Sequence, residues 1–142
     1  MRNLKNRIME AENIKFRGKS KKTGEWLYGD LVRNVEGAFA IVPPLNYHGN
    51  YEVDKETIGQ FIGMTDKNEN EIYDGDIIKT DDGLDISGYY KVSYDIDTTG
   101  FVCIGKDFHC RPGIIEEFSD IVVVGNIYDN KELLTQEYER ID

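Results

Sequence analysis

One cluster of side chains in this 142-residue sequence is of a type that binds zinc. Cys103, His109 and Cys110 offer two thiolates and an imidazole, which are ligands that Zn²⁺ prefers. Structural zinc sites usually hold their ligands in Cys-x2-Cys or His-x3-His pairs, and the spacing here matches neither. Because His109 and Cys110 are adjacent, they would belong to opposite faces of an extended segment. We therefore expect ordinary reduced cysteines and no bound metal.

A second cluster resembles part of a calcium loop. Asp66, Asn68 and Asn70 occupy positions 1, 3 and 5 of such a loop. The glycine required at position 6 is Glu71, and the bidentate glutamate required at position 12 is Ile77. Asp and Asn side chains also bond their own backbone in tight turns. The sequence favours a turn over a metal site.

Paired carboxylates are the remaining candidates for catalysis. Asp74 with Asp76, and Asp95 with Asp97, have the residue types of a two-carboxylate hydrolase. Most of these acids stand beside Gly, Asn or Thr, which is typical of solvated loops. The sequence contains no Gly-x-Ser-x-Gly, Walker A or Gly-x-Gly-x-x-Gly motif. We expect no enzyme and no cofactor, and keep a small metal-dependent enzyme as the least favoured alternative.

Charge is distributed unevenly along the chain. The net charge is −10, yet residues 1–25 hold eight Lys or Arg and only three Glu. This basic segment offers phosphate or partner contacts, or it pairs with the acidic body of the same or another subunit. An acidic body disfavours non-specific binding of nucleic acid. The candidate contact residues are Arg2, Lys5, Arg7, Lys15, Arg17, Lys19, Lys21 and Lys22.

Aromatic side chains form the second group of binding candidates. A stacking platform for bases or a protein-binding face would use Trp26, Tyr28, Tyr73 and Tyr89. Packing in the core or between subunits explains these aromatic residues equally well.

The elements that position these side chains are mostly strands. Alternating and β-branched runs, separated by Gly, Asn, Asp and Pro, predict strands at 14–17, 26–33, 38–42, 76–80, 89–96, 101–104 and 121–124. Residues 34–37 and 97–100 are predicted hairpin turns. Residues 55–63 fit either a strand or a helical turn. Short helices are predicted at 114–118 and 131–138.

Burial can be predicted for two of these strands. In the strand 89–96, alternation places Tyr90, Val92, Tyr94 and Ile96 on one buried face. The β-branched run 121–124 is typical of a strand buried on both faces.

The predicted fold class is mainly β, with short antiparallel strands in a sandwich or barrel-like arrangement and a small C-terminal helix. Residues 1–12 are expected to be an extension or a short helix, and residues 13–142 a β domain. Two β-subdomains joined near 43–60, where Pro43 and Pro44 end a strand, are an alternative. An echo between Tyr28-Gly29-Asp30 and Tyr73-Asp74-Gly75-Asp76 suggests equivalent elements in the two subdomains.

Three ordered stretches resemble a known family. Residues 14–18 (IKFRG) and 24–32 (GEWLYGDLV) open the match, residues 60–78 (QFIGMTDKNENEIYDGDII) form its centre, and residues 122–130 (VVVGNIYDN) close it. These stretches resemble the YopX-like family of phage and prophage proteins, which implies a β-rich fold and no agreed activity. Glu69 stands where that family usually has glycine. Since Glu tolerates positive φ poorly, we expect Asn68 or Asn70 to take the left-handed position, or the loop to differ.

The expected function is that of a phage- or prophage-encoded accessory protein that binds proteins or assembles with itself. Exposed strand edges and the basic head predict a homo-oligomer, alongside an unknown phage or host protein as partner. A nucleic-acid-associated protein that uses the basic N-terminal segment is the alternative. The longest apolar runs are too short to span a membrane, so we expect a cytoplasmic protein in the host cell.

Overall fold

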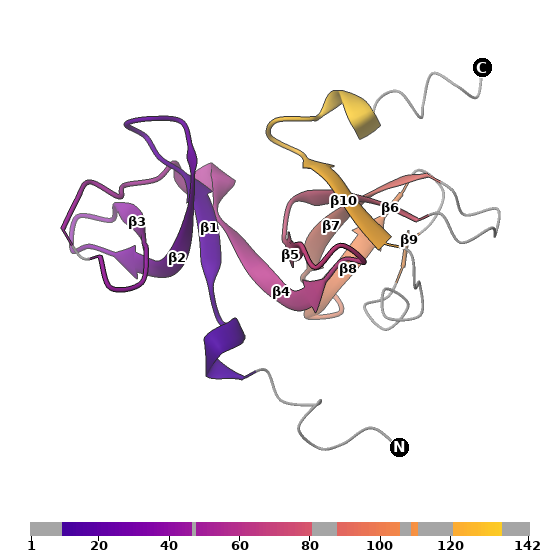
Figure 1. Ribbon diagram of the computed structural model, residues 1–142, viewed down its shortest axis with the longest axis horizontal. Helices are drawn as coiled ribbons and strands as arrows, with labels where there is room; N and C mark the ends of the chain where they lie inside the picture. The colour runs from indigo at the N-terminus through magenta and orange to yellow at the C-terminus, as the bar shows by residue number, and fades with distance from the viewer. Residues whose placement is uncertain (1–9, 47, 81–87, 106–108, 111–120, 135–142) are drawn as a thin grey trace. The chain divides into compact units, whose positions relative to one another are not determined.

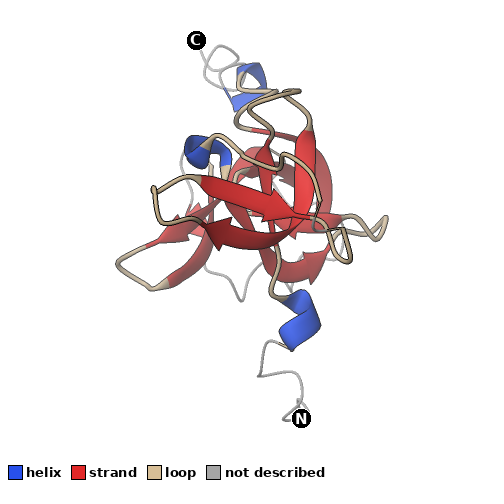
Figure 2. Cartoon of the chain, turned by 90° about the vertical axis from the view of Figure 1, so that its left-hand side faces the viewer, coloured by secondary structure: helices blue, strands red, loops and turns tan. Residues whose placement is uncertain are grey.

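The computed structural model describes residues 10–46, 48–80, 88–105, 109–110 and 121–134 (Figure 1). The chain divides into two units, residues 1–63 and residues 64–142. Strands and loops make up most of the described chain, and its helical segments are only a few residues long (Figure 2). The predicted mainly β fold class is confirmed.

The first unit is built on antiparallel strands in the order β3-β2-β1-β4. Its elements are the 3-10 helix η2 (Ala11–Asn13), β1 (Phe16–Lys19), β2 (Trp26–Arg33), β3 (Phe39–Val42), the 3-10 helix η3 (Lys55–Thr57) and β4 (Gly59–Thr65). The predicted β2–β3 hairpin is confirmed, with Asp30 opposite Val42 and Arg33 opposite Phe39. Both alternatives for residues 55–63 are present, because a 3-10 turn leads directly into a strand.

Residues 51–53 cover the outer edge of β3 and return the chain to β1. Ala40 bridges Glu52, and Val53 bridges Ser20 at the end of β1. Gly18 of β1 allows this close approach, since a Cβ there would lie 3.1 Å from the Cβ of Val53. The core of the unit forms at this junction, where Val53 is buried.

The second unit repeats this strand order. Its strands are β5 (Glu71–Tyr73), β6 (Asp76–Thr80), β7 (Tyr89–Asp95), β8 (Gly100–Ile104), β9 (His109–Cys110) and β10 (Ile121–Asn126), and β5 pairs with the end of β4. In the order β10-β6-β7-β8-β9, the strands β6, β7 and β8 lie side by side as β1, β2 and β3 do. The last strand, β10, lies beside β6 as β4 lies beside β1. Residues 132–134 are helical, which confirms the small C-terminal helix; 135–138 lie outside the described residues.

The repeat of topology does not follow the sequence echo. Gly29 lies inside β2, the second strand of its unit, whereas Gly75 lies in the turn before β6. The predicted equivalence of these two elements is therefore wrong. The similarity of the units lies in their strand order.

Two burial predictions need correction. Tyr90 and Val92 are buried as expected, but Tyr94 near the end of β7 is 51% exposed, and Ile96, which lies in the turn after β7 ends at Asp95, is 79% exposed. In β10, Val124 is 38% exposed: it lies where the register with β6 shifts between Val123 and Gly125, and β10 is the outermost strand of its sheet. The predicted helix at 114–118 lies outside the described residues.

Candidate functional site

The first unit contains an open hollow of about 270 Å³ beside the β2–β3 hairpin. We call it the hairpin groove and define it by its lining residues: Val32, Asn34, Ala38, Phe39, Ala40, Gly49, Asn50, Tyr51 and Glu52. Apolar side chains supply much of this lining, with polar groups among them. Such a composition suits an apolar ligand group held in place by a few polar contacts.

Local sequence explains how the groove forms. Val32 of β2 is opposite Ala40 of β3, and Ala40 bridges Glu52 on the following segment. Because Ala40 is small, the surface is hollow at this point. The turn is fixed by the Asn34 side chain, which accepts hydrogen bonds from the backbone N–H groups of Glu36 and Ala38 at 2.9 Å each.

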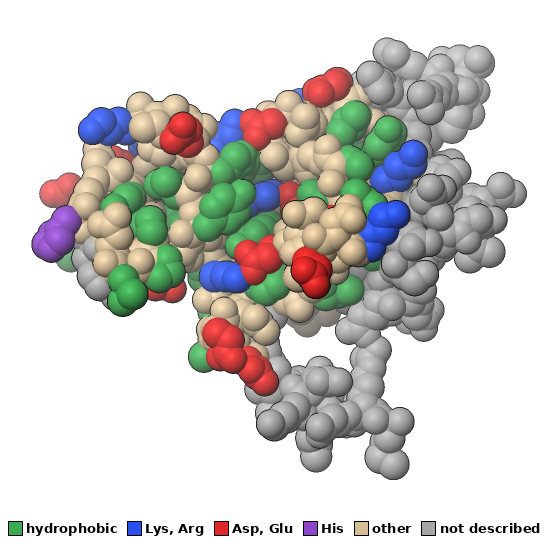
Figure 3. Space-filling model, viewed as in Figure 1, with side chains coloured by type: hydrophobic (Ala, Val, Ile, Leu, Met, Phe, Trp, Pro, Cys, Tyr) green, Lys and Arg blue, Asp and Glu red, His purple; other side chains and the backbone are tan. Residues whose placement is uncertain are grey.

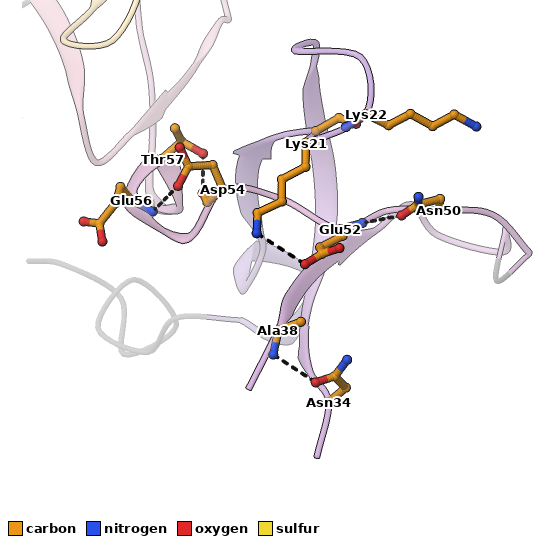
Figure 4. A network of polar contacts seen from close by, with 10 residues as sticks. Lys21, Lys22, Asn34, Ala38, Asn50, Glu52, Asp54, Glu56 and Thr57 are labelled. Atoms are coloured by element: carbon orange, nitrogen blue, oxygen red, sulfur yellow. Dashed lines mark hydrogen bonds and ion pairs between the residues drawn. The ribbon is translucent and has the colours of Figure 1, made fainter. Parts of the chain in front are cut away.

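The opposite wall is held by polar contacts (Figure 4). The Asn50 side chain accepts a hydrogen bond from the Glu52 N–H at 3.3 Å. Lys21 pairs with the Glu52 carboxylate at 3.4 Å. This ion pair is exposed and contributes little to stability. It places one carboxylate and one ammonium at the border of the groove.

Exposed apolar side chains occur in the groove and in the loops of the same unit. Val32 is 47% exposed, while Val35 at the hairpin turn and Leu45 in the following loop are more than 85% exposed. Several hydrophobic side chains reach the surface of the described residues (Figure 3). Val35 directly follows Asn34, which lines the groove, and exposed apolar surface beside a hollow is typical of interaction sites. Our reading of the sequence missed this site, although valine in a hairpin turn and leucine after Pro43-Pro44 were available signals.

The predicted basic and aromatic residues meet on one face along β1. The Lys15 ammonium lies 4.9 Å from the centre of the Phe61 ring. The guanidinium of Arg17 and the ammonium of Lys19 lie 4.6 Å and 5.5 Å from the centre of the Trp26 ring. These distances are in the range of cation–π contacts. The face thus combines cations and rings, but they already contact one another.

The accessibility of this basic–aromatic face is uneven. Arg17 is only 5% exposed, whereas Tyr28, its partner across β1 and β2, is 48% exposed. Lys21 and Lys22 are exposed in the turn after β1. Arg2, Lys5 and Arg7 lie outside the described residues.

The two predicted aromatic residues of the second unit occupy different environments. Tyr73 is 2% exposed, and its hydroxyl donates to the Glu71 carboxylate at 3.1 Å. Tyr89 is half-buried on β7. Tyr73 is therefore a core residue of the second unit.

The cluster considered for calcium forms a turn, as the sequence favoured. One carboxylate oxygen of Asp66 accepts the backbone N–H groups of Asn68 and Asn70 at 2.9 Å each. The other oxygen accepts the Val123 N–H of β10 at 3.0 Å and the Asn70 side-chain amide at 3.2 Å. Burial alone would raise the pKa of Asp66, but these hydrogen bonds outweigh it and lower the pKa below its ordinary value. The loop is thereby tied to the outer edge of β10.

The left-handed residue of this loop is Glu69, with φ 65°. The expectation that Asn68 or Asn70 would take that conformation is wrong. The hydrogen bonds from both asparagine N–H groups to Asp66 fix their places and leave Glu69 at the turn. Glycine would fit this position without a Cβ penalty.

The other residues of the central and closing stretches also support the backbone. Asp76 is 2% exposed and accepts the Tyr73 N–H at 2.8 Å across the turn at Gly75, whose φ is 93°. The Asn130 side chain accepts the Asn126 N–H at 3.1 Å, and a Cβ at Gly125 would lie 2.5 Å from the same side-chain oxygen. These motifs therefore build turns.

The residues considered for zinc are placed by the β8–β9 pairing. Cys103 is opposite Cys110, and Ile104 is opposite His109. Consecutive positions of a strand belong to opposite faces, as expected for His109 and Cys110. Among the described residues, no three His, Cys, Asp or Glu side chains come together as metal ligands. Within the same residues, no helix has the length and apolar character needed to cross a membrane.

Comparison with known proteins identifies a family and a similar solved structure. A family model described as YopX protein matches residues 15–135. The crystal structure of protein EF1440 from Enterococcus faecalis is similar, with a TM-score of 0.56 and 21% sequence identity. That match covers 85% of this chain and 97% of the other, and at this identity it shows the fold alone. No curated protein matches the sequence.

Proposed function

The chain belongs to the YopX protein family, and we propose that it is a non-catalytic accessory protein, encoded by a phage or prophage, that works by self-assembly. The observation that carries this proposal is the hairpin groove, with exposed Val32 in its lining and exposed Val35 in the adjoining hairpin turn. Removing such side chains from water against another chain is favourable by about 25 cal/mol for each Å² of apolar area, and this gain must exceed the cost of association. Its place of action, on this proposal, is the cytoplasm of the host cell.

The occupant that best fits the groove is the N-terminal segment of a second copy. Residues 1–9 (MRNLKNRIM) carry three basic and no acidic residues, so the remaining chain has a charge of −13. Opposite charges of this size attract the segment to the body of another copy. Leu4, Ile8 and Met9 supply apolar groups for the hollow, and a basic side chain of the segment would compete with Lys21 for the Glu52 carboxylate.

Two carboxylates of the chain serve to hold its backbone, and this supports the non-catalytic part of the proposal. All four hydrogen bonds to the Asp66 carboxylate come from N–H groups that hold a loop and a strand. Asp76 is buried and accepts a backbone N–H. These carboxylates have structural roles, in contrast to the poised acids and bases of active sites.

Native mass spectrometry of the full chain tests the proposal through three variants. Val32→Asp places a charge in the groove, and the triple change Arg2→Glu, Lys5→Glu, Arg7→Glu reverses the charge of the N-terminal segment. Val124→Asp is the control, because Val124 is an exposed valine of the second unit. We expect a discrete oligomer for the wild type and the control, and a monomer for the other two.

Each contrary result has a separate meaning. A monomeric wild type overturns self-assembly. An oligomer that survives Val32→Asp excludes the groove as the interface, and one that survives the charge reversal excludes the N-terminal segment. Thermal melts of every variant establish that the protein is folded.

The basic–aromatic face along β1 favours nucleic-acid binding as a second candidate function. Lys15, Lys19, Trp26 and the exposed Tyr28 combine cations with rings on which bases stack. Against it, Arg17 is buried and the cations already contact aromatic rings. Fluorescence anisotropy with single-stranded DNA tests this function: affinity that falls steeply with salt and is lost in Lys15→Glu with Lys19→Glu would favour it over self-assembly.

A further inference from the structure

We propose that Cys103 and Cys110 are a modification site at which the chain forms a reversible intramolecular disulfide. They are the only two cysteines of the sequence, and the antiparallel ladder places them directly opposite each other on β8 and β9. This site is independent of the hairpin groove, which belongs to the first unit.

The register gives the right backbone spacing. Directly opposed residues of an antiparallel pair have Cα atoms about 4.5–5.5 Å apart. Disulfides span Cα separations of about 4.4–6.8 Å. The neighbouring pair, Ile104 and His109, belongs to the opposite face of the ladder. The two cysteines thus occupy the pair of positions on β8 and β9 that a disulfide can bridge.

The position of β9 explains what the bond would do. β9 is a two-residue strand at the end of the sheet order, and its register with β8 consists of two residue pairs. A disulfide would add a covalent link to this short ladder and close a loop from residue 103 to residue 110. Cys103 is 2% exposed, so its thiol must be uncovered by local opening before it reacts, and the reaction should be slower than at an exposed thiol.

The chemistry is thiol–disulfide exchange with glutathione disulfide as oxidant. One cysteine thiolate attacks the glutathione disulfide, forms a mixed disulfide and releases one glutathione thiolate. The second cysteine thiolate then attacks the protein sulfur of that mixed disulfide and releases the second glutathione. The two protein thiols are oxidised to one disulfide, glutathione disulfide is reduced to two thiols, and the two protons pass from the cysteines to glutathione.

The test is refolding of the full chain from denaturant in a glutathione redox buffer, so that burial of Cys103 cannot block the reaction. We expect a monomer mass lower by two hydrogens, loss of both alkylation sites and full reversal by dithiothreitol. The oxidised protein should melt about 5 °C higher than the reduced protein, because the closed loop restricts the unfolded chain. Thiols that remain open to alkylation, or disulfides between chains, overturn the proposal.

A matched control variant distinguishes the effect of the β8–β9 register from the mere closeness of two cysteines along the chain. The double change His109→Cys with Cys110→Ser moves the thiol by one residue, to the position opposite Ile104. The number of thiols is unchanged, but the thiol now belongs to the other face of β9. We expect at least a tenfold lower ratio of oxidised to reduced protein at the same redox potential. Equal oxidation of the control and the wild type would show that the pairing of β8 and β9 has no part in the reaction.

Discussion

Asp66→Asn tests whether one carboxylate ties the central loop to β10. The substitution keeps the shape of the side chain and the oxygen that accepts from Asn68 and Asn70, but turns an NH2 group toward the Val123 N–H. Hydrogen bonds to charged groups contribute about 1.5–3 kcal/mol each, and a buried N–H left without an acceptor costs about 1–3 kcal/mol. The side chain of Asn70 is exposed and can turn away. We therefore expect the free energy of unfolding to fall by about 2–3 kcal/mol, mainly through Val123.

The pH dependence gives a second and independent readout. The pKa of Asp66 is lower in the folded protein than its ordinary value of 3.8. Ionised Asp66 therefore stabilises the fold fully above pH 3.8, and this contribution disappears as the pH falls through the folded pKa. Asparagine does not titrate. The difference in stability between wild type and variant should be greatest near pH 7 and shrink as the pH falls below 3.8.

Urea unfolding followed by circular dichroism at pH 7 and pH 3 measures both effects. Asp30→Asn is the matched control, because it removes the same charge from an exposed position of β2. We expect the control to change the free energy of unfolding by less than about 0.5 kcal/mol at either pH. Equal effects of Asp66→Asn and Asp30→Asn, or a pH-independent loss in the former, would refute the assigned role of the carboxylate.

Three further changes test the turns and close approaches. Glu69→Gly should raise the free energy of unfolding by about 0.5–1 kcal/mol in urea, since relief of the left-handed conformation outweighs the entropy of glycine; a loss of stability would contradict the observed φ. Gly29→Ala should lower the free energy of unfolding by about 3 kcal/mol or more, because a Cβ would collide with the Val42 carbonyl and the residue has φ 155°. A neutral result would disprove that close approach. Gly125→Ala should cost about 1–3 kcal/mol by displacing the Asn130 side chain, and the penalty should shrink in an Asn130→Ala background.

Local rules predicted most of the strands and few of the exposed surfaces. The bounds of β2 and β6 follow from alternation and turn residues, and the structure has the predicted ends. Periodicity does not report where a strand lies in its sheet, so the exposure of Val124 and Ile96 was not foreseen. The pairing of Cys103 with Cys110 depends on register, which the sequence alone does not specify.

For the binding candidates too, residue type was known from the sequence but the place of the side chain in the fold was not. Arg17 and Tyr73 were predicted from their types as surface contacts, yet both are buried. An aromatic or basic side chain serves packing as well as recognition, and only its neighbours decide between the two. Val35 and Leu45 are apolar but exposed. An apolar residue in an exposed turn gains nothing from the fold of its own unit, so such a residue indicates an interaction surface.

The motif residues that carry the family resemblance act on the backbone. Gly18 allows β1 to approach Val53, Asp66 holds the central loop, Asp76 closes the turn at Gly75, and Gly125 accommodates Asn130. Such roles depend on conformation and close approach, so they specify a scaffold and no particular ligand.

The hairpin groove differs from these motifs. Apart from Val32, its apolar lining lies between the stretches that resemble the family, as do the exposed residues Val35 and Leu45. Substitutions there should alter subunit number and lower the melting temperature only by what assembly adds, so that it no longer depends on protein concentration. Changes at Gly29, Asp66 or Gly125 should lower the stability of the folded chain itself and leave subunit number unchanged. A groove variant that unfolds the protein without altering its association would show that these apolar residues serve the fold, and the self-assembly proposal would lose its main support.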